Sequence, residues 1–325
     1  MNKRRFLASA LLPALAAGLG PSLARAQAYP SKPIRIIASS APGGTVDLLS
    51  RLLALKFPAA LGQPTIVENK AGASGYIGTE YVARQPADGH TLLVVASSHS
   101  TNHLLNPKLT VDPVRDFAPI SLLTTNYFVV AVPSASPVNS MKELIALARQ
   151  KPGGLSYSTP GVGQGAHLGM ELLRTMGGFN AVHVPFTGTG PATVALLGGQ
   201  VDVSLLTPTG AMQHLKSGKL KVLAVTSSRR SASLPNVPTV AEAGFPGYEL
   251  TGWIGLLAPA GTPPEIVRRL QREAANALKQ PDVLAQLEAV ESEPVGSTPE
   301  QFAAFMKDDV ARWEKLIKQA GVKGE

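Results

Sequence analysis

The chain contains no cysteine, so disulfide bonds, thiol catalysis and cysteine-ligated metal sites are excluded. It also lacks the G-x-x-x-x-G-K-S/T loop that binds nucleotides and the G-x-S-x-G elbow of serine hydrolases. Lysine and arginine are scattered, and beyond residue 26 only Arg229-Arg230 and Arg268-Arg269 are adjacent. Because nucleic-acid binding needs a basic stripe, we expect no nucleic-acid partner.

Residues 1–26 have the pattern of a secretory signal peptide. The basic start Lys3–Arg5 precedes an apolar run over 6–20, and Ala24-Arg25-Ala26 fits the small-x-small cleavage rule. We expect export to the periplasm with cleavage near Ala26, although a second small-x-small site would move the cut to Ala28. The Lys-Arg pairing leaves the Sec and Tat export routes both open.

Removal of this segment takes away four basic side chains and no acidic one, so the net charge falls from +8 to +4. The remaining 299 residues are enough for one large or two medium domains. No later segment is long and apolar enough to cross a membrane, and we expect a soluble mature protein.

Short β-rich runs alternate with helical patterns from residue 33 to 228. This alternation is typical of α/β domains with mostly parallel sheets, which bind ligands beyond the carboxyl ends of their strands. The predicted strands cover residues 33–38, 65–68, 91–97, 127–132, 155–158, 181–185, 201–206, 221–226 and 248–258. The tail is predicted to be helical, with an apolar stripe from Phe302 to Ile317 that includes Trp313 and packs in a core.

The strands at 127–132 and 248–257 bracket the middle of the chain, so we expect them to cross between two domains as a hinge. One domain is predicted to cover 27–127 together with 249–325, and the other to cover 128–248.

Two glycine-rich stretches, within 34–47 and 155–166, each follow a predicted strand and precede a predicted helix. Such a turn leaves backbone N–H groups unpaired at the positive end of a helix dipole, where anions bind. Facing each other, the two would clamp an anionic group. Neither contains Lys or Arg, which suits capture and release of a carboxylate held by amides, hydroxyls and water. We call residues 39–45 the first clamp loop and residues 158–164 the second; the expected ligand-binding residues in them are Ser39, Ser40, Ala41, Gly43, Gly44, Thr45, Ser158, Thr159, Gly161, Gly163 and Gln164.

Several residues near these loops have other interpretations. The G-x-G-x-x-A match at 161–166 resembles a dinucleotide site, but the acidic residue expected about 20 positions later is missing. His99 and His103 have the spacing of two metal ligands on a helix, yet no third ligand is evident, and a loop or capping role is favoured. His167 could donate to an anion, or it could cap or pack at the helix start.

Eight short stretches follow one another along nearly the whole chain in a characteristic order. They are Tyr29–Ile34, Ala41–Asp47, Val67–Gly72, Pro86–Leu93, Asp116–Ile120, His183–Phe186, Leu223–Thr226 and Leu234–Gly244. With these stretches the chain resembles the Bug family, the periplasmic solute-binding receptors of tripartite tricarboxylate transport systems.

The resemblance implies a type II periplasmic binding fold, in which two α/β domains joined by two crossing strands close over a small carboxylate. It implies no catalysis and no cofactor, and as partner the membrane permease subunits of the transport system. From the residues themselves we expect no metal site. We expect the receptor to be a monomer. The family's ligand loops, with a water-bridged carboxylate, correspond here to Ser39–Asp47 and Ser158–His167; further expected ligand-binding residues are Asp47, Ser98, His167 and Phe186.

The chain departs from the family pattern at three places. Ser40 stands where a bulky residue is usual, and Phe186-Thr187 replaces the commoner Tyr-Lys. Leu206 stands where many members carry Asp, which removes a partner for a ligand ammonium and favours a simple carboxylate over an amino acid. Asp47 could still take that role.

Two functions besides transport remain compatible with these residues. A sensory receptor that signals ligand occupancy to a membrane kinase would have the same cleft. A periplasmic enzyme would use His167.

Overall fold

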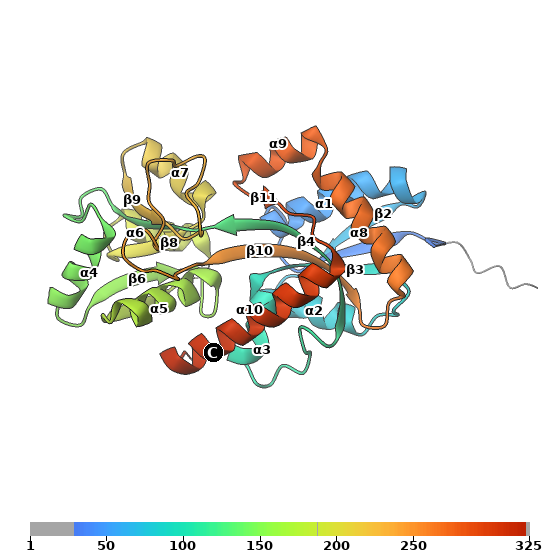
Figure 1. Ribbon diagram of the computed structural model, residues 1–325, viewed down its shortest axis with the longest axis horizontal. Coiled ribbons are helices and arrows are strands. Elements are labelled where there is room, and N and C mark those ends of the chain that lie inside the picture. The colour runs from blue at the N-terminus through green and yellow to red at the C-terminus, as the bar shows by residue number, and fades with distance from the viewer. Residues whose placement is uncertain (1–28, 187, 323–325) are drawn as a thin grey trace, which may run out of the picture.

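The computed structural model describes residues 29–186 and 188–322, so the predicted signal peptide and its cleavage sites lie outside the described residues. The described chain forms two α/β domains arranged along the long axis of the molecule (Figure 1). This arrangement confirms the predicted fold class. No helix within 29–186 or 188–322 combines the length and apolar character that a membrane span requires.

The first domain is built on a six-stranded mixed sheet with the strand order β11-β4-β10-β3-β1-β2. Its strands are β1 (Ile34–Ala38), β2 (Thr65–Asn69), β3 (Thr91–Ala96), β4 (Phe117–Tyr127), β10 (Thr251–Pro259) and β11 (Glu293–Pro294). Strand β1 pairs in parallel with β2 and β3, whereas β10 runs antiparallel to β3 and β4. Its helical segments are α1 (Thr45–Leu61), η1 (Ala73–Gly75), α2 (Tyr76–Ala83), η2 (Ser97–Ser100), α3 (Asn102–Leu105), α8 (Pro264–Leu278) and α9 (Pro281–Ala289).

Helices cover both faces of this sheet, and the central strand β3 shows why its sequence is almost continuously apolar. Alternate side chains of a strand point to opposite faces. Leu92 and Val94 therefore pack in the core with α1 and α8. Leu93 and Val95 pack in a second core on the other face, with α2.

The second domain has a five-stranded sheet with the order β7-β6-β8-β5-β9. Its strands are β5 (Val129–Pro133), β6 (Leu155–Thr159), β7 (Ala181–Pro185), β8 (Val203–Leu206) and β9 (Leu220–Val225). Strand β6 is parallel to β7 and β8, and β5 is antiparallel to β8 and β9. Its helices are α4 (Met141–Gln150), α5 (Gly165–Gly177), α6 (Thr189–Leu197) and α7 (Pro208–Lys216).

The predicted strand at 127–132 is wrong in its extent. Instead, β4 ends at Tyr127, and β5 begins at Val129 in the other sheet. Strand β4 was missed because Pro119 and several hydroxyl side chains interrupt its apolar pattern. Tertiary contacts stabilise it: β10 pairs along its whole length, and the buried Ser121 Oγ donates to the Ser297 carbonyl at 2.9 Å. The short β11 was missed as well.

Three segments meet where the chain passes between the domains, at Phe128, Thr226 and Leu250. The Phe128 N–H donates to Thr226 Oγ1, and Thr226 Oγ1 donates to the Leu250 carbonyl, both at 2.8 Å. Backbone bonds of 2.9 Å join Thr226 to the same two residues. We call Phe128, Thr226 and Leu250 the crossing. The predicted domain boundary at 128 coincides with Phe128 and the one at 249 is next to Leu250; both boundaries stay predictions.

The last helix, α10 (Pro299–Ala320), packs against both domains (Figure 1). Near its start, Phe302 packs with Trp253 of β10 in the first domain. Near its end, Trp313 and Ile317 are buried in the core of the second domain. The predicted apolar stripe is therefore buried, but it belongs to two cores, so α10 ties the domains together at a second place.

Candidate ligand-binding site

The first clamp loop joins β1 to α1 and is held from within by Asp47. This buried carboxylate accepts hydrogen bonds from the Gly43 N–H (3.0 Å), Arg51 Nε (2.9 Å) and Asn69 Nδ2 (2.8 Å). The bond from Arg51, supported by the other two, lowers the pKa of Asp47 to about 2. Both carboxylate oxygens are thus engaged in positioning the loop. A ligand contact by Asp47 stays a prediction.

Helix α1 begins after Gly44, which has no side chain, and α5 begins after Gln164, whose side chain accepts no hydrogen bond from the helix. Hydroxyl groups cap α4, α7 and α10, whereas α2, α3, α6, α8 and α9 also begin without a side-chain cap. An uncapped helix start leaves N–H donors and a partial positive charge for an anion. The two clamp loops, one in each domain, therefore both offer neutral anion-binding groups.

The second clamp loop joins β6 to α5 and is held by two histidines. His167 Nδ1 accepts a hydrogen bond from the Gly163 N–H at 3.0 Å. His183 Nε2 lies 2.6 Å and the Gly161 carbonyl oxygen 3.1 Å from Thr159 Oγ1. The hydroxyl has one proton, so the tautomer of His183 decides which of the two receives it. His167 thus packs at the helix start and positions the loop through the Gly163 N–H.

The two imidazoles stack on each other, with centroids 3.9 Å apart, and His183 stacks on Tyr157 at 5.0 Å. Burial lowers the pKa of His167, and burial together with the neighbouring His167 lowers the pKa of His183 to about 4. Both rings are neutral at pH 7. Sequence reasoning assigned His183 no role, because its contact with the loop depends on the pairing of β7 with β6.

A hydrogen bond connects the two domains across the cleft. Gln164 Nε2 of the second clamp loop donates to Ser74 Oγ in the first domain at 2.8 Å. Ser98 Oγ donates to the Ser74 carbonyl, also at 2.8 Å. The adjacent Gly75 lies against Ser39, because a Cβ on Gly75 would be 3.2 Å from the Ser39 carbonyl oxygen. The predicted ligand-binding residues Ser39, Ser98 and Gln164, which are far apart in the sequence, therefore lie close to Ser74 or its neighbour Gly75.

Ser74 itself was missed by sequence reasoning. Its backbone is left-handed, with φ of 54° and ψ of 33°, a conformation that non-glycine residues seldom adopt and that concentrates at functional sites. Only the folded geometry reveals this signal.

Two predicted residues have their hydroxyls directed elsewhere. Ser158 is fully buried, and its Oγ donates to the Ala192 carbonyl of α6 at 3.0 Å. Thr159 is also fully buried, and its hydroxyl contacts His183 and Gly161 as described above. Phe186 lies beside the loop, with its N–H donating to the Thr159 carbonyl. Ligand contacts by these residues stay predictions.

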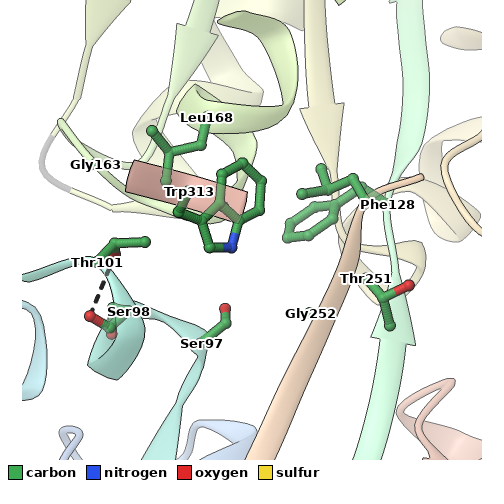
Figure 2. Close-up of a pocket in the computed structure, with 11 residues that line it drawn as sticks. Ser97, Ser98, Thr101, Phe128, Gly163, Leu168, Thr251, Gly252 and Trp313 are labelled. Atoms are coloured by element: carbon green, nitrogen blue, oxygen red, sulfur yellow. Dashed lines mark hydrogen bonds between the residues drawn. The ribbon is translucent and has the colours of Figure 1, made fainter. Parts of the chain in front are cut away.

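A small cavity lies between the domains, next to the second clamp loop and the crossing (Figure 2). It is lined by Ser97, Ser98, Thr101, Phe128, Gly163, Gly165, Leu168, Leu250, Thr251, Gly252 and Trp313. Its free space is about 10 Å³, roughly the room that one water needs. Of the predicted ligand-binding residues, Ser98 and Gly163 line it, whereas the residues of the first clamp loop do not.

His99, one of the two histidines considered as a metal site, has other contacts. His99 is buried, its Nε2 lies 3.0 Å from the Pro113 carbonyl oxygen, and burial lowers its pKa to about 4. Across residues 29–186 and 188–322, no group of three His, Asp or Glu side chains is arranged to hold a metal ion. The geometry of His99 matches the loop role favoured from the sequence.

Comparisons with known proteins fit this arrangement of two domains and a cleft. A family model described as "Tripartite tricarboxylate transporter family receptor" matches residues 49–322. The chain belongs to this family. The tripartite tricarboxylate transporter receptors are solute-binding proteins rather than enzymes, and the family includes relatives named Bug. The chain is similar to Protein BugT of Bordetella pertussis, with 35% identity over 325 residues and 99% of each chain covered.

Solved structures of similar receptors support the same fold. An R. palustris protein solved with adipate has a TM-score of 0.80 and 34% identity, and the match covers 91% of this chain and 100% of that one. MatC from Rhodopseudomonas palustris, solved with bound malate, has a TM-score of 0.75 and 32% identity, covering 89% of this chain and 100% of MatC.

Proposed function

We propose that this receptor captures a small carboxylate between its two domains in the periplasm and delivers it to a membrane permease. The observation that carries the proposal is the pair of uncapped helix starts, one in each domain, with Gln164 and Ser74 bonded across the cleft between them. Neutral N–H groups at two helix starts can bind a carboxylate without a permanent ion pair, which favours release as well as capture.

The similar receptors support the ligand class. Adipate and malate, the ligands of the two solved neighbours, are both carboxylates. Residues from both domains line the cavity, and its free space of about 10 Å³ is too small for any ligand larger than water. A carboxylate therefore enters when the domains separate, and closure around the crossing then brings the Gln164 side chain back to Ser74.

Both clamp loops come from one chain, so the proposed function needs no second copy, and we propose a monomeric receptor. The permease partner follows from the transport system for which the family is named.

Thermal unfolding of the chain from Gln27 onward, measured against mono-, di- and tricarboxylates and amino acids, tests the binding proposal. A ligand at 100 times its Kd that binds only the folded state adds about 2.7 kcal/mol to the free energy of unfolding. The variant Gln164→Ala is expected to lower the affinity for the stabilising carboxylate severalfold, because it removes the hydrogen bond across the cleft. No stabilisation by any carboxylate would contradict the proposal.

Uptake of the labelled hit by cells with and without this receptor tests delivery. Loss of uptake in the deletion strain, restored by the wild-type chain, is the expected result. Unchanged uptake together with tight binding would instead favour a sensory role.

A further inference from the structure

The cavity between the domains has no charged side chain among its eleven lining residues. Its polar groups are hydroxyls of the first domain and of β10: Ser97, Ser98, Thr101 and Thr251. Its other side chains are apolar: Phe128, Leu168, Leu250 and Trp313. Figure 2 shows Leu168, Trp313 and Phe128 on one side of the cavity, opposite Ser97, Ser98 and Thr101. We call Phe128, Leu168, Leu250 and Trp313 the apolar wall.

The apolar wall begins directly at the start of α5. A Cβ on Gly165, the first residue of that helix, would lie 3.1 Å from the tip of the Phe128 ring. A carboxylate bound to the N–H groups at this helix start therefore has an aromatic ring as its next neighbour. The part of the ligand that extends from the carboxylate lies against apolar side chains.

The charged side chains that contact lining residues have partners already. Asp309 accepts the Trp313 indole N–H at 2.9 Å, Glu249 accepts the Thr251 hydroxyl at 3.2 Å, and neither carboxylate lines the cavity. The Arg312 guanidinium lies over the Trp313 ring at 5.1 Å and donates to the Glu249 carbonyl, and it does not line the cavity. Asp47, the carboxylate of the first clamp loop, accepts three hydrogen bonds from its own surroundings. No charged side chain lines the cavity itself to pair with a second carboxylate or an ammonium on the ligand.

We propose that the ligand is a monocarboxylate with a compact apolar body, carrying neither a second carboxylate nor an ammonium group. This inference rests on the proposed function and narrows it. A second charge buried against the apolar wall would lose its hydration without a partner, which disfavours di- and tricarboxylates and amino acids. Short aliphatic and single-ring aromatic acids share the required chemistry.

Isothermal titration of the chain from Gln27 onward with matched acids tests the ligand class. Hexanoate, adipate and 2-aminohexanoate share a six-carbon chain and differ only by an added carboxylate or ammonium; benzoate provides an aromatic body. We expect hexanoate or benzoate to bind at least about 100-fold more tightly than adipate and 2-aminohexanoate. Adipate or 2-aminohexanoate binding as tightly as the better monocarboxylate would overturn the inference while leaving carboxylate capture intact. If no mono-, di- or tricarboxylate binds, both the inference and the proposed function are overturned.

A charged side chain introduced at Ser97, which lines the cavity, provides a second test. Ser97 is half-buried, points toward the cavity in Figure 2 and makes no side-chain hydrogen bond within the described residues. Ser97→Lys is expected to shift the ratio of adipate to hexanoate affinity at least about tenfold toward adipate, because the new ammonium pairs with the second carboxylate. Ser97→Met, of similar length and uncharged, is the matched control and is expected to keep the preference for hexanoate. An equal shift in both variants would contradict the electrostatic reason.

Discussion

The imidazole rings of His167 and His183 stack with their centroids 3.9 Å apart and their planes 12° apart. One ring comes from α5 and the other from β7, and between them they contact Gly163 and Thr159 of the second clamp loop. The loop therefore takes its shape from two neutral histidines. If His167 Nδ1 were protonated, it could no longer accept the hydrogen bond from the Gly163 N–H, because both groups would then be donors.

Because both histidines are neutral in the folded chain, we expect the free energy of unfolding to fall at acidic pH. Burial lowers the pKa of both rings, that of His183 to about 4, so the unfolded chain binds protons that the folded chain does not. The free energy of unfolding is therefore expected to be highest above the unfolded pKa of about 6.5 and to fall as the pH drops toward 4. Urea unfolding at pH 7.5 and at pH 5.0 measures the difference.

His183→Gln separates this contribution from that of His99, whose pKa burial also lowers to about 4. Glutamine can still form a hydrogen bond with Thr159 but does not titrate. The variant is expected to lose less stability between the two pH values than the wild type, whereas an equal loss would assign the effect to other groups. The charged neighbours of the pair, Glu171 and Arg174, are unchanged in both proteins.

Substitution of Gly163 is expected to disturb the second clamp loop. Its φ is +74°, and an added Cβ would lie 2.1 Å from Leu105 Cδ1 of the first domain. Gly163→Ala is therefore expected to weaken ligand binding about tenfold, because the methyl group strains the left-handed backbone of the loop and displaces the Leu105 side chain. Titration with the ligand from the thermal screen measures the affinity.

Gly178 at the other end of α5 provides the matched control. It also has positive φ (+59°), but a Cβ there would meet no atom within 4 Å. Gly178→Ala is expected to lose about 1–2 kcal/mol of stability, from backbone strain alone, and to keep its ligand affinity. The double variant Gly163→Ala, Leu105→Ala should recover part of the affinity. If it does not, Leu105 is not the obstacle.

The clamp loops could be located from the sequence because each is a local pattern, a short apolar strand followed by glycines and then a helical stripe. Strand β4 could not, since Pro119 and the buried hydroxyls near it are tolerated only through pairing with β10 and contacts with Ser297. Ser74 and His183 were missed for a related reason. Their contacts with the second clamp loop join segments distant in the chain, and neither follows from spacing.

Loss of the Asp309 carboxylate on α10 is expected to lower the stability of the protein strongly. It is buried, and its two carboxylate oxygens accept the indole N–H groups of Trp253 and Trp313, each at 2.9 Å. Asp309→Leu leaves both donors without an acceptor, which is expected to cost about 1–3 kcal/mol for each buried group. These are the only two tryptophans in the chain, so fluorescence during urea unfolding reports on both.

The neighbouring Asp308 serves as the control for Asp309. Its side chain is exposed, so Asp308→Leu is expected to change the free energy of unfolding by no more than about 0.5 kcal/mol. Similar losses in the two variants would mean that the indole contacts contribute little.

Substitution of Thr226 tests how much the stability of the crossing depends on one hydroxyl group. Thr226→Val keeps the shape of the side chain but removes both of its 2.8 Å hydrogen bonds, leaving the Phe128 N–H and the Leu250 carbonyl without that partner. We expect a loss of about 1–3 kcal/mol in the free energy of unfolding. Thr226→Ser keeps the hydroxyl and should retain most of the stability, apart from the small cost of losing one methyl group. If serine destabilised the protein as much as valine, packing of the methyl group rather than hydrogen bonding would hold the crossing together.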